Sequence, residues 1–205
     1  ENAERALDDG AGLIILSDRG ASQQQTPIPA LLAIGAVHHH LIRQGKRSKC
    51  GLIIETAEAR EVHHIACLLG YGAGAVNPYL AIASIEQLIL DGQLNDGEQT
   101  KTVGREKAIA NYIKAVEKGV LKVMSKIGIA TLQSYRGGQI FEIIGINASV
   151  IDRYFTGTRS RIAGAGLEEI AEELAQRHKQ AYTVENSSGP DELDVGGVYQ
   201  WRRNG

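Results

Sequence analysis

The sequence predicts an α/β fold: a parallel β-α-β segment with flanking helices, followed by a mainly helical segment that leads toward a (β/α) barrel. Residues 12–18 and 50–56 are short, continuous apolar runs, which is the pattern of strands buried in a parallel sheet. Residues 26–45, between these runs, carry apolar side chains at helical spacing. Strands that alternate with helices in this way are typical of a parallel sheet with helical crossovers.

The first half of the chain contains clear start and stop signals. In the helix predicted over residues 26–45, Thr26 is placed to cap, Pro27 takes the first position and Gly45 ends the helix. Its inward stripe consists of Leu31, Ile34, Val37 and Leu41. The next predicted elements are a helix at 58–74 ended by Gly70 and Gly72, a short strand at 75–81 with a turn at Asn77 and Pro78, and a helix at 83–94.

The second half is predicted to be mainly helical. Residues 95–104 are polar and glycine-containing, so we expect a linker or an exposed loop there. Residues 105–129 have a strong helical pattern with one apolar face, formed by Ile109, Tyr112, Ile113, Val116, Val120 and Val123. The remaining elements are short helices at 138–145 and 149–154, an amphipathic helix at 166–182 with Leu167, Ile170, Ala171 and Leu174 inward, and a loop at 183–197.

The composition is that of an ordinary globular protein. The chain has 205 residues, of which 43% are apolar and 22% charged, and its net charge is −2. This balance gives no reason to expect a nucleic-acid partner, and no apolar run reaches the roughly 20 residues that span a bilayer. Cys50 and Cys67 are expected to be small core residues in a reducing compartment. The chain starts within an amphipathic stretch and stops without a closing element, so we expect a piece of a longer polypeptide.

Charged and polar residues end the first two predicted strands. Asp18 and Arg19 follow one strand, and Glu55 and Thr56 close the next. Ligands of open parallel sheets bind at the carboxyl ends of the strands, so these residues, together with Arg60, could form a small-ligand site. The alternative, which we favour, is that they cap helices or pair with Arg19 and Arg60, because charged strand ends are common in such sheets.

The histidines invite a metal site, but their spacing argues against one. His38, His39 and His40 are consecutive, and successive helical residues are turned by about 100° from one another, so the three cannot converge on one ion. The pair His63 and His64 lacks the i, i+4 spacing of helical zinc ligands. One histidine from each helix could still meet across an interface, but packing or surface roles are favoured.

Other short patterns carry little chemistry. The glycines of residues 70–74 follow a helix and precede a strand, which is the reverse of the order in a dinucleotide-binding loop. Ser17 lacks the flanking glycines of a nucleophile elbow, so it is a weak candidate for a catalytic triad. Arg159 and Arg161 lie among small residues and could bind a phosphate or carboxylate, or could equally hold a tight turn.

Several long segments resemble the large subunit of glutamate synthase. The strongest is GVLKVMSKIGIATLQSYRGGQIFEIIGI, residues 119–146. LSDRG with PIPALLAIGAVHHHLI, and IIETAEAREVHHIACLLGYGAGAVNPYLA, are similar to the central domain of that family. VIDRYFTGTRSRIAGAGLEEIAEE and GGVYQWRRNG resemble the start of its FMN-binding synthase domain. The resemblance covers nearly the whole chain, in order and without large gaps.

This resemblance implies a parent enzyme that converts glutamine and 2-oxoglutarate into two glutamates, with FMN and a 3Fe-4S cluster. Its electrons would come from ferredoxin or an NAD(P)H-oxidising small subunit, in the cytoplasm or a plastid stroma. Residues 1–100 would be the C-terminal part of the central α/β domain. Residues 101–205 would be the helical end of that domain and the lead-in to the FMN domain. The catalytic cysteine of the amidotransferase domain and the cluster cysteines would lie elsewhere, and neither Cys50 nor Cys67 has cluster spacing.

We therefore expect no catalytic residue, no metal ligand and no bound cofactor in this piece, and no activity from it alone. Its partners would be the neighbouring amidotransferase and FMN domains of the same chain. Within residues 122–142, small side chains would permit close approach of those domains, while Lys126, Tyr135 and Arg136 could hold the interface by hydrogen bonds. The small residues in question are Ser125, Gly128, Gly137 and Gly138.

Overall fold

The computed structural model describes residues 2–94 and 104–183, which form two small parallel sheets with helices packed around them. The elements, in order, are α1 (Asn2–Asp8), β1 (Leu13–Ser17), α2 (Ala30–Arg43), the 3₁₀ turn η1 (Arg47–Lys49), β2 (Gly51–Glu55), α3 (Val62–Gly70), β3 (Ala75–Asn77), α4 (Tyr79–Leu90), α5 (Arg105–Lys126), α6 (Leu132–Tyr135), β4 (Glu142–Ile146), α7 (Ala148–Tyr154), β5 (Arg159–Ala165) and α8 (Leu167–Thr183). The predicted α/β class with a parallel β-α-β segment is confirmed, and the described strands close no barrel.

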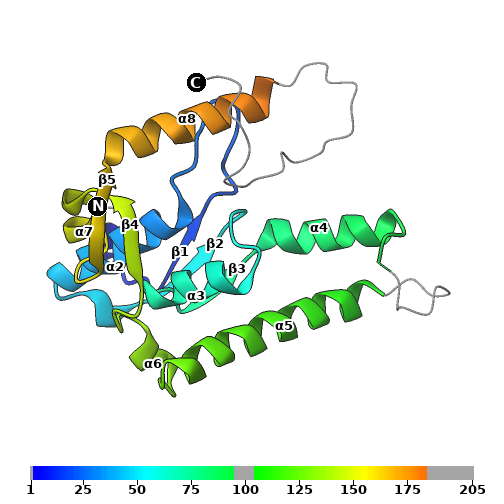
Figure 1. Ribbon diagram of the computed structural model, residues 1–205, viewed down its shortest axis with the longest axis horizontal. Coiled ribbons are helices and arrows are strands. Elements are labelled where there is room, and N and C mark those ends of the chain that lie inside the picture. The colour runs from blue at the N-terminus through cyan, green and yellow to red at the C-terminus, as the bar shows by residue number, and fades with distance from the viewer. Residues whose placement is uncertain (1, 95–103, 184–205) are drawn as a thin grey trace.

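The first sheet has the order β1-β2-β3, and all of its strands are parallel. Its core consists of alternate side chains of the strands, Ile14, Leu52 and Ile54, packed against Ile34 and Leu41 of α2. Figure 1 shows β1, β2 and β3 side by side in the middle of the molecule, with α2 and α3 beside them. Pairing places Ser17 opposite Glu55, and Glu55 opposite Asn77, so the carboxyl ends of three strands meet at one edge.

Three of the predicted helix starts are wrong by three or four residues. Helix α2 begins at Ala30 and not near Thr26, because Pro29 restricts the residue before it to extended backbone. The Glu58 side chain then accepts a hydrogen bond from the Ala30 N–H at 2.7 Å, which satisfies an exposed donor of the helix start. Helix α3 starts at Val62, so Glu58, which makes this contact, lies before the helix and not within it. Helix α4 starts at Tyr79, directly after Pro78.

Residues 142–165 form a second β-α-β unit that was not predicted from the sequence. The helix predicted at 138–145 is wrong, since β4 occupies Glu142–Ile146, whereas the helix predicted at 149–154 is confirmed as α7. Strand β5, Arg159–Ala165, pairs in parallel with β4. Both strands contain glycines, which are unusual inside strands, so they were not predicted. A Cβ at Gly164 would lie 2.3 Å from the carbonyl oxygen of Gly145, so the two backbones can approach this closely only with glycine.

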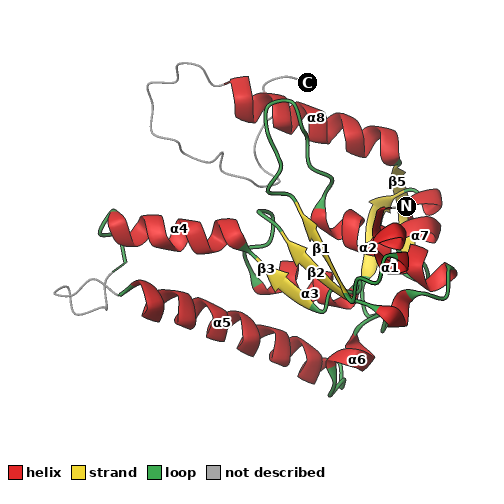
Figure 2. Cartoon of the chain, turned by 180° about the vertical axis from the view of Figure 1, so that it is seen from behind, coloured by secondary structure: helices red, strands yellow, loops and turns green. Residues whose placement is uncertain are grey.

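Helices α4 and α5 lie side by side and project from the body of the molecule (Figures 1 and 2). Of the face predicted for α5, Val120 is buried and Ile113 is 46% exposed, while the buried residues Ala108 and Met124 were not anticipated. In α8, Ile170 and Leu174 are half-buried, but Leu167 and Ala171 are exposed, contrary to expectation. The predicted linker at 95–104 and the loop at 183–197 lie almost entirely outside the described residues.

The stretch 122–142 is held in the core by one aromatic side chain. Tyr135 is fully buried, and its hydroxyl donates to the carbonyl oxygen of Ala66 in α3 at 3.1 Å. The N–H of Gly137 donates to the carbonyl oxygen of Gly70 at 2.8 Å. Gly128 and Gly137 have positive φ, 73° and 74°, and a Cβ at either would meet nothing within 4 Å. Glycine is favoured at both positions by the positive φ of the backbone, and not by close contact with another described residue.

Candidate functional site

The candidate site is the carboxyl edge of the first sheet, where polar side chains from all three strands converge. The group comprises Ser17, Asp18, Arg19, Glu55, Thr56 and Asn77, and we call it the carboxyl-edge cluster. The parallel register brings the members together, because Ser17, Glu55 and Asn77 are paired across neighbouring strands. This is where ligands bind in open parallel sheets.

Asp18 organises the turn that follows β2. Its carboxylate accepts hydrogen bonds from the Thr56 hydroxyl at 2.6 Å and from the Ala57 N–H at 2.9 Å. The Thr56 oxygen in turn accepts from the N–H of Glu58 at 3.1 Å, and Thr56 is fully buried. Buried polar groups must find partners, so Asp18 here secures the chain between β2 and α3.

Glu55 is the centre of a second set of contacts. Its carboxylate accepts hydrogen bonds from Ser17 Oγ at 2.6 Å and Asn77 Nδ2 at 3.0 Å, and it pairs with Arg19 Nε at 2.7 Å. These hydrogen bonds, that of Ser17 first and then that of Arg19, lower the pKa of Glu55. The guanidinium of Arg19 also lies over the ring of Tyr79, 4.1 Å from its centroid. A carboxylate with three partners is held ionised and is a poor proton donor near neutral pH.

Tyr79 completes the edge as a neutral phenol. Burial raises its pKa to about 12, and a hydrogen bond and the negative charge of Asp18 act in the same direction. Neither Tyr79 nor Glu55 is therefore tuned toward the neutral range that general acid–base catalysis requires. The cluster is built as a set of mutual contacts, with Glu55 held ionised and the Tyr79 phenol protonated.

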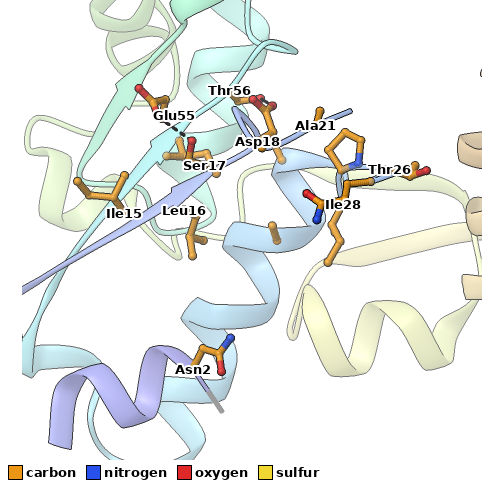
Figure 3. A pocket seen from close by; sticks show the side chains of 16 residues that line it. Asn2, Ile15, Leu16, Ser17, Asp18, Ala21, Thr26, Ile28, Glu55 and Thr56 are labelled. Atoms are coloured by element: carbon orange, nitrogen blue, oxygen red, sulfur yellow. Dashed lines mark hydrogen bonds between the residues drawn. The ribbon is translucent and has the colours of Figure 1, made fainter. Parts of the chain in front are cut away.

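A cavity of about 510 Å³ opens beside the cluster (Figure 3). One wall is formed by the end of β1 and β2, and Figure 3 shows Asp18 and Thr56 pointing toward each other there, with the Ser17 and Glu55 pair nearby. The opposite wall comes from residues 20–28 and the start of α2, and includes the apolar side chain of Ile28. The lining thus combines the carboxylates of Asp18 and Glu55 with apolar side chains on both walls, Leu16 of β1 on one and Ile28 on the other.

The structure brings together most of the residues that the sequence reading selected. Asp18, Arg19, Glu55 and Thr56 lie in one cluster, whereas Arg60 does not join it: its N–H donates to His64 Nδ1 and its carbonyl accepts from Tyr112. Ser17 binds Glu55 and no histidine, so the triad reading has no geometric support. The sequence analysis did not select Asn77 of the cluster or Tyr79 beside it; Asn77 could have been found because it ends the third strand.

The histidines are engaged in separate contacts. His38 Nδ1 accepts from Arg47 Nε at 2.9 Å, and His40 Nε2 lies 3.0 Å from Glu4 Oε2. His63 Nε2 lies 3.6 Å from Cys67 Sγ within α3. In the part of the chain that the structure describes, no three side chains of the metal-binding types gather at one point.

Both cysteines are at least partly shielded from solvent. Cys50 is buried in the core, and Cys67 is half-buried with its pKa raised to about 11 by burial. Both are free thiols. A thiol with a raised pKa is a weak nucleophile and a poor metal ligand at neutral pH.

The two arginines of β5 form an exposed surface feature. Arg161 Nε lies 3.3 Å from Glu142 Oε1 of β4, with 78% of its side chain exposed. Arg159 is also exposed at the start of the strand. They lie along a strand and not in the tight turn considered above.

No helix in the described ranges combines the length and apolarity that a bilayer crossing requires.

Comparison with known proteins assigns the chain to a family. A family model for the glutamate synthase central domain matches residues 1–147. The chain is 50% identical to the glutamate synthase [NADPH] large chain of Bacillus subtilis over 203 residues, 99% of this chain and 13% of that protein. It is 42% identical to glutamate synthase [NADH] of Saccharomyces cerevisiae over 205 residues, which is 99% of this chain and 10% of that protein. The ferredoxin-dependent glutamate synthase 1, chloroplastic/mitochondrial, of Arabidopsis thaliana is 41% identical over 211 residues, 100% of this chain and 13% of its own length. The chain therefore spans about an eighth or less of these relatives, and it belongs to the glutamate synthase central domain family.

Proposed function

We propose that this chain is a non-catalytic segment that joins the working domains of a glutamate synthase. In the parent reaction, glutamine hydrolysis releases ammonia, which adds to 2-oxoglutarate, and the 2-iminoglutarate formed is reduced to glutamate. The proposal rests on the family match over residues 1–147 and on the relatives named above. Because the segment covers a small part of those relatives, the activity belongs to the parent and not to these residues.

The observation that carries the proposal is that the carboxyl-edge cluster is satisfied by its own members. Asp18 binds Thr56 and the Ala57 N–H, and Glu55 binds Ser17, Asn77 and Arg19. A catalytic centre needs groups that are free to contact a substrate, with pKa values near the working pH. A cluster whose carboxylates already hold two or three donors each is better suited to fixing loops than to turnover.

Neither the two cysteines nor the carboxyl-edge cavity fits the cofactors of the parent. A 3Fe-4S cluster requires cysteine thiolates, and the chain has only Cys50, which is buried, and Cys67, whose pKa is raised. A flavin phosphate would meet the carboxylates of Asp18 and Glu55 in the carboxyl-edge cavity, and like charges repel. FMN and the 3Fe-4S cluster are therefore assigned to other parts of the parent. The electron donor would be ferredoxin or an NAD(P)H-oxidising subunit.

We also propose where the segment sits in the parent. Residues 1–100 belong to the C-terminal part of the central domain, and residues 101–205 lead toward the FMN-binding domain. The amidotransferase and FMN domains would be its neighbours, and ammonia would pass between them. Relatives from bacteria and plant chloroplasts suggest the cytoplasm or the plastid stroma as its location.

The isolated 205-residue chain tests this proposal. We expect no glutamine hydrolysis and no quenching of FMN fluorescence on titration, with far-UV circular dichroism as the check that the chain is folded. Measurable turnover of glutamine by the folded chain would overturn the non-catalytic role.

A second function is favoured by one observation, the cavity of about 510 Å³ beside Asp18 and Glu55. A small ligand with a cationic or hydroxyl-bearing end and an apolar end would match its two walls. Asp18→Asn and Glu55→Gln in the natural full-length enzyme distinguish the two functions. Loss of substrate affinity with unchanged thermal unfolding would favour the ligand site, whereas a lowered unfolding temperature with unchanged Michaelis constants would favour the joining role.

A further inference from the structure

A second cavity, of about 440 Å³, lies between η1 and α6 and has a strongly basic lining. The residues around it are His38, Ile42, Gly45, Arg47, Ser48, Gln133 and Arg136. Arg47 precedes β2, and the Nη1 atom of Arg136 would lie 3.9 Å from a Cβ built on Gly74, just before β3. The cavity is therefore at the amino end of the sheet, on the side opposite the carboxyl-edge cluster.

Among the described residues, Arg47 is held by neutral acceptors and by no carboxylate. Its Nε donates to His38 Nδ1 at 2.9 Å, its Nη1 to the carbonyl of Cys50 at 2.8 Å, and its Nη2 to the carbonyl of Gly72 at 2.8 Å. These acceptors fix the guanidinium but do not neutralise its charge. Burial is the main cause that lowers the pKa of Arg47, and the nearby charge of Arg136 acts in the same direction.

The backbone on either side of Arg136 is anchored, while its side-chain Nε has no partner among the described residues. Its neighbours on either side are anchored, Tyr135 by the Ala66 carbonyl and Gly137 by the Gly70 carbonyl. Its Nε is buried without a hydrogen-bond acceptor among the described residues. Buried donors without acceptors are rare in native proteins, and each calls for an explanation.

His38 supplies no negative charge to balance the two arginines. Its Nδ1 already accepts from Arg47, and burial, followed by the charges of Arg47, His39 and Arg136, lowers its pKa to about 4. It is therefore neutral at physiological pH. Two guanidinium groups thus share one cavity, and the described residues that line it include neither Asp nor Glu.

We propose that Arg47 and Arg136 form a binding site for an oxyanion at the amino end of the sheet. A carboxylate or phosphate placed between the two arginines would neutralise both charges and accept hydrogen bonds from their Nη groups. Two sources share this chemistry: a free anion, or a carboxylate side chain from another part of the natural protein. Ser48 and Gln133, at the rim, supply neutral donors for the same ligand. The site is distinct from the carboxyl-edge cluster and goes beyond the joining function proposed above.

Hydrogen–deuterium exchange of the natural full-length protein tests the site, read in the peptides that cover η1 and α6. Wild type, Arg136→Gln, Arg136→Lys and the exposed control Arg177→Gln are compared in sodium acetate, sodium phosphate and sodium chloride at equal ionic strength. If the anion is free, acetate or phosphate should slow exchange in the wild type and in Arg177→Gln by about tenfold relative to chloride. Arg136→Gln should lose this salt response, and Arg136→Lys should keep part of it.

If the natural protein supplies its own carboxylate, exchange in the wild type should be equally slow in all three salts. Arg136→Gln should then speed exchange, and Arg136→Lys should restore part of the protection because it keeps the positive charge. The proposal is overturned if Arg136→Gln exchanges like the wild type in every salt. It is also overturned if Arg136→Gln and Arg136→Lys accelerate exchange equally and independently of salt, since that result indicates lost packing alone.

Discussion

At the scale of single residues, the Tyr135 hydroxyl connects the stretch 122–142 to α3. The side chain is fully buried and donates to the Ala66 carbonyl, so its removal leaves a buried acceptor with one partner fewer. We expect Tyr135→Phe to lower the free energy of unfolding by about 1 kcal/mol in urea denaturation. Tyr182→Phe is the control, because Tyr182 is 43% exposed on α8. Equal stability of both variants would show that the hydroxyl contributes nothing.

His38 makes the stability of the chain depend on pH. Burial, with the charges around Arg47, lowers its folded pKa to about 4 from an ordinary value of 6.5. As the pH falls below 6.5, the unfolded chain takes up a proton that folded His38 does not, so the folded state loses stability until the pH reaches about 4. The loss amounts to about 3 kcal/mol over this window, from the shift of the pKa.

The test for His38 is the slope of stability against pH. His38→Gln keeps a neutral hydrogen-bond acceptor for Arg47 and removes the titrating group. We expect the decline in unfolding free energy between pH 7 and pH 4 to be about 3 kcal/mol smaller in this variant than in the wild type. His63→Gln, at an exposed position of α3, is the control and should keep the wild-type slope. Parallel curves for His38→Gln and the wild type would rule out His38 as the source.

At the scale of elements, the close packing of α5 on α3 depends on Gly119. A Cβ at this position would lie 2.2 Å from Cγ2 of Val62, far inside van der Waals contact. Gly→Ala ordinarily stabilises a helix interior by roughly 0.5–1 kcal/mol, but here the overlap should reverse the sign. We expect Gly119→Ala to lower the free energy of unfolding by about 1–3 kcal/mol. Lys118→Ala, on the exposed face of the same helix, should change it by less than about 0.5 kcal/mol. A stabilised Gly119→Ala would contradict the packing.

The elements also show which features can be read from sequence. The strands β1 and β2 were predicted because their apolar runs are continuous and end in polar residues, and α5 because its apolar spacing extends over 22 residues. The strands β4 and β5 were missed because Gly145 and Gly164 interrupt them, and glycine in a strand usually argues against one. The start of α2 was misplaced because its cap comes from Glu58, which is 28 residues distant from Ala30.

The candidate site was predictable only in part, for a similar reason. Asp18 and Glu55 were found because both end strands, and strand ends meet at one edge of a parallel sheet. That they bind Thr56, Asn77 and other members of the cluster, instead of facing outward, depends on side-chain directions in space. The basic cavity of Arg47 and Arg136 could not be anticipated, because the two residues are far apart in sequence and belong to different elements.

At the scale of the whole molecule, two polar centres lie at opposite ends of one parallel sheet. The carboxyl-edge cluster is internally paired, whereas the cavity at the amino end holds two arginines with no counter-charge from the residues that the structure describes. Helices α4 and α5 project from the body, and Leu80, Leu88 and Leu90 of α4 are exposed. Under the joining function proposed above, neighbouring domains would cover these exposed leucines.

The most direct test of the joining function is the coupling of the two half-reactions in the natural full-length enzyme. A Cβ at Gly138 would lie 3.1 Å and 3.2 Å from the carbonyl oxygens of Ser134 and Tyr135, so we expect Gly138→Val to shift the backbone after α6 by a few tenths of an ångström. Gly104→Val is the control, since its Cβ would meet no described residue within 4 Å and its φ is −62°. We expect Gly138→Val to raise the glutamine hydrolysed per glutamate formed from 2-oxoglutarate, while Gly104→Val keeps the wild-type ratio. An unchanged ratio in a folded Gly138→Val enzyme would contradict the joining function.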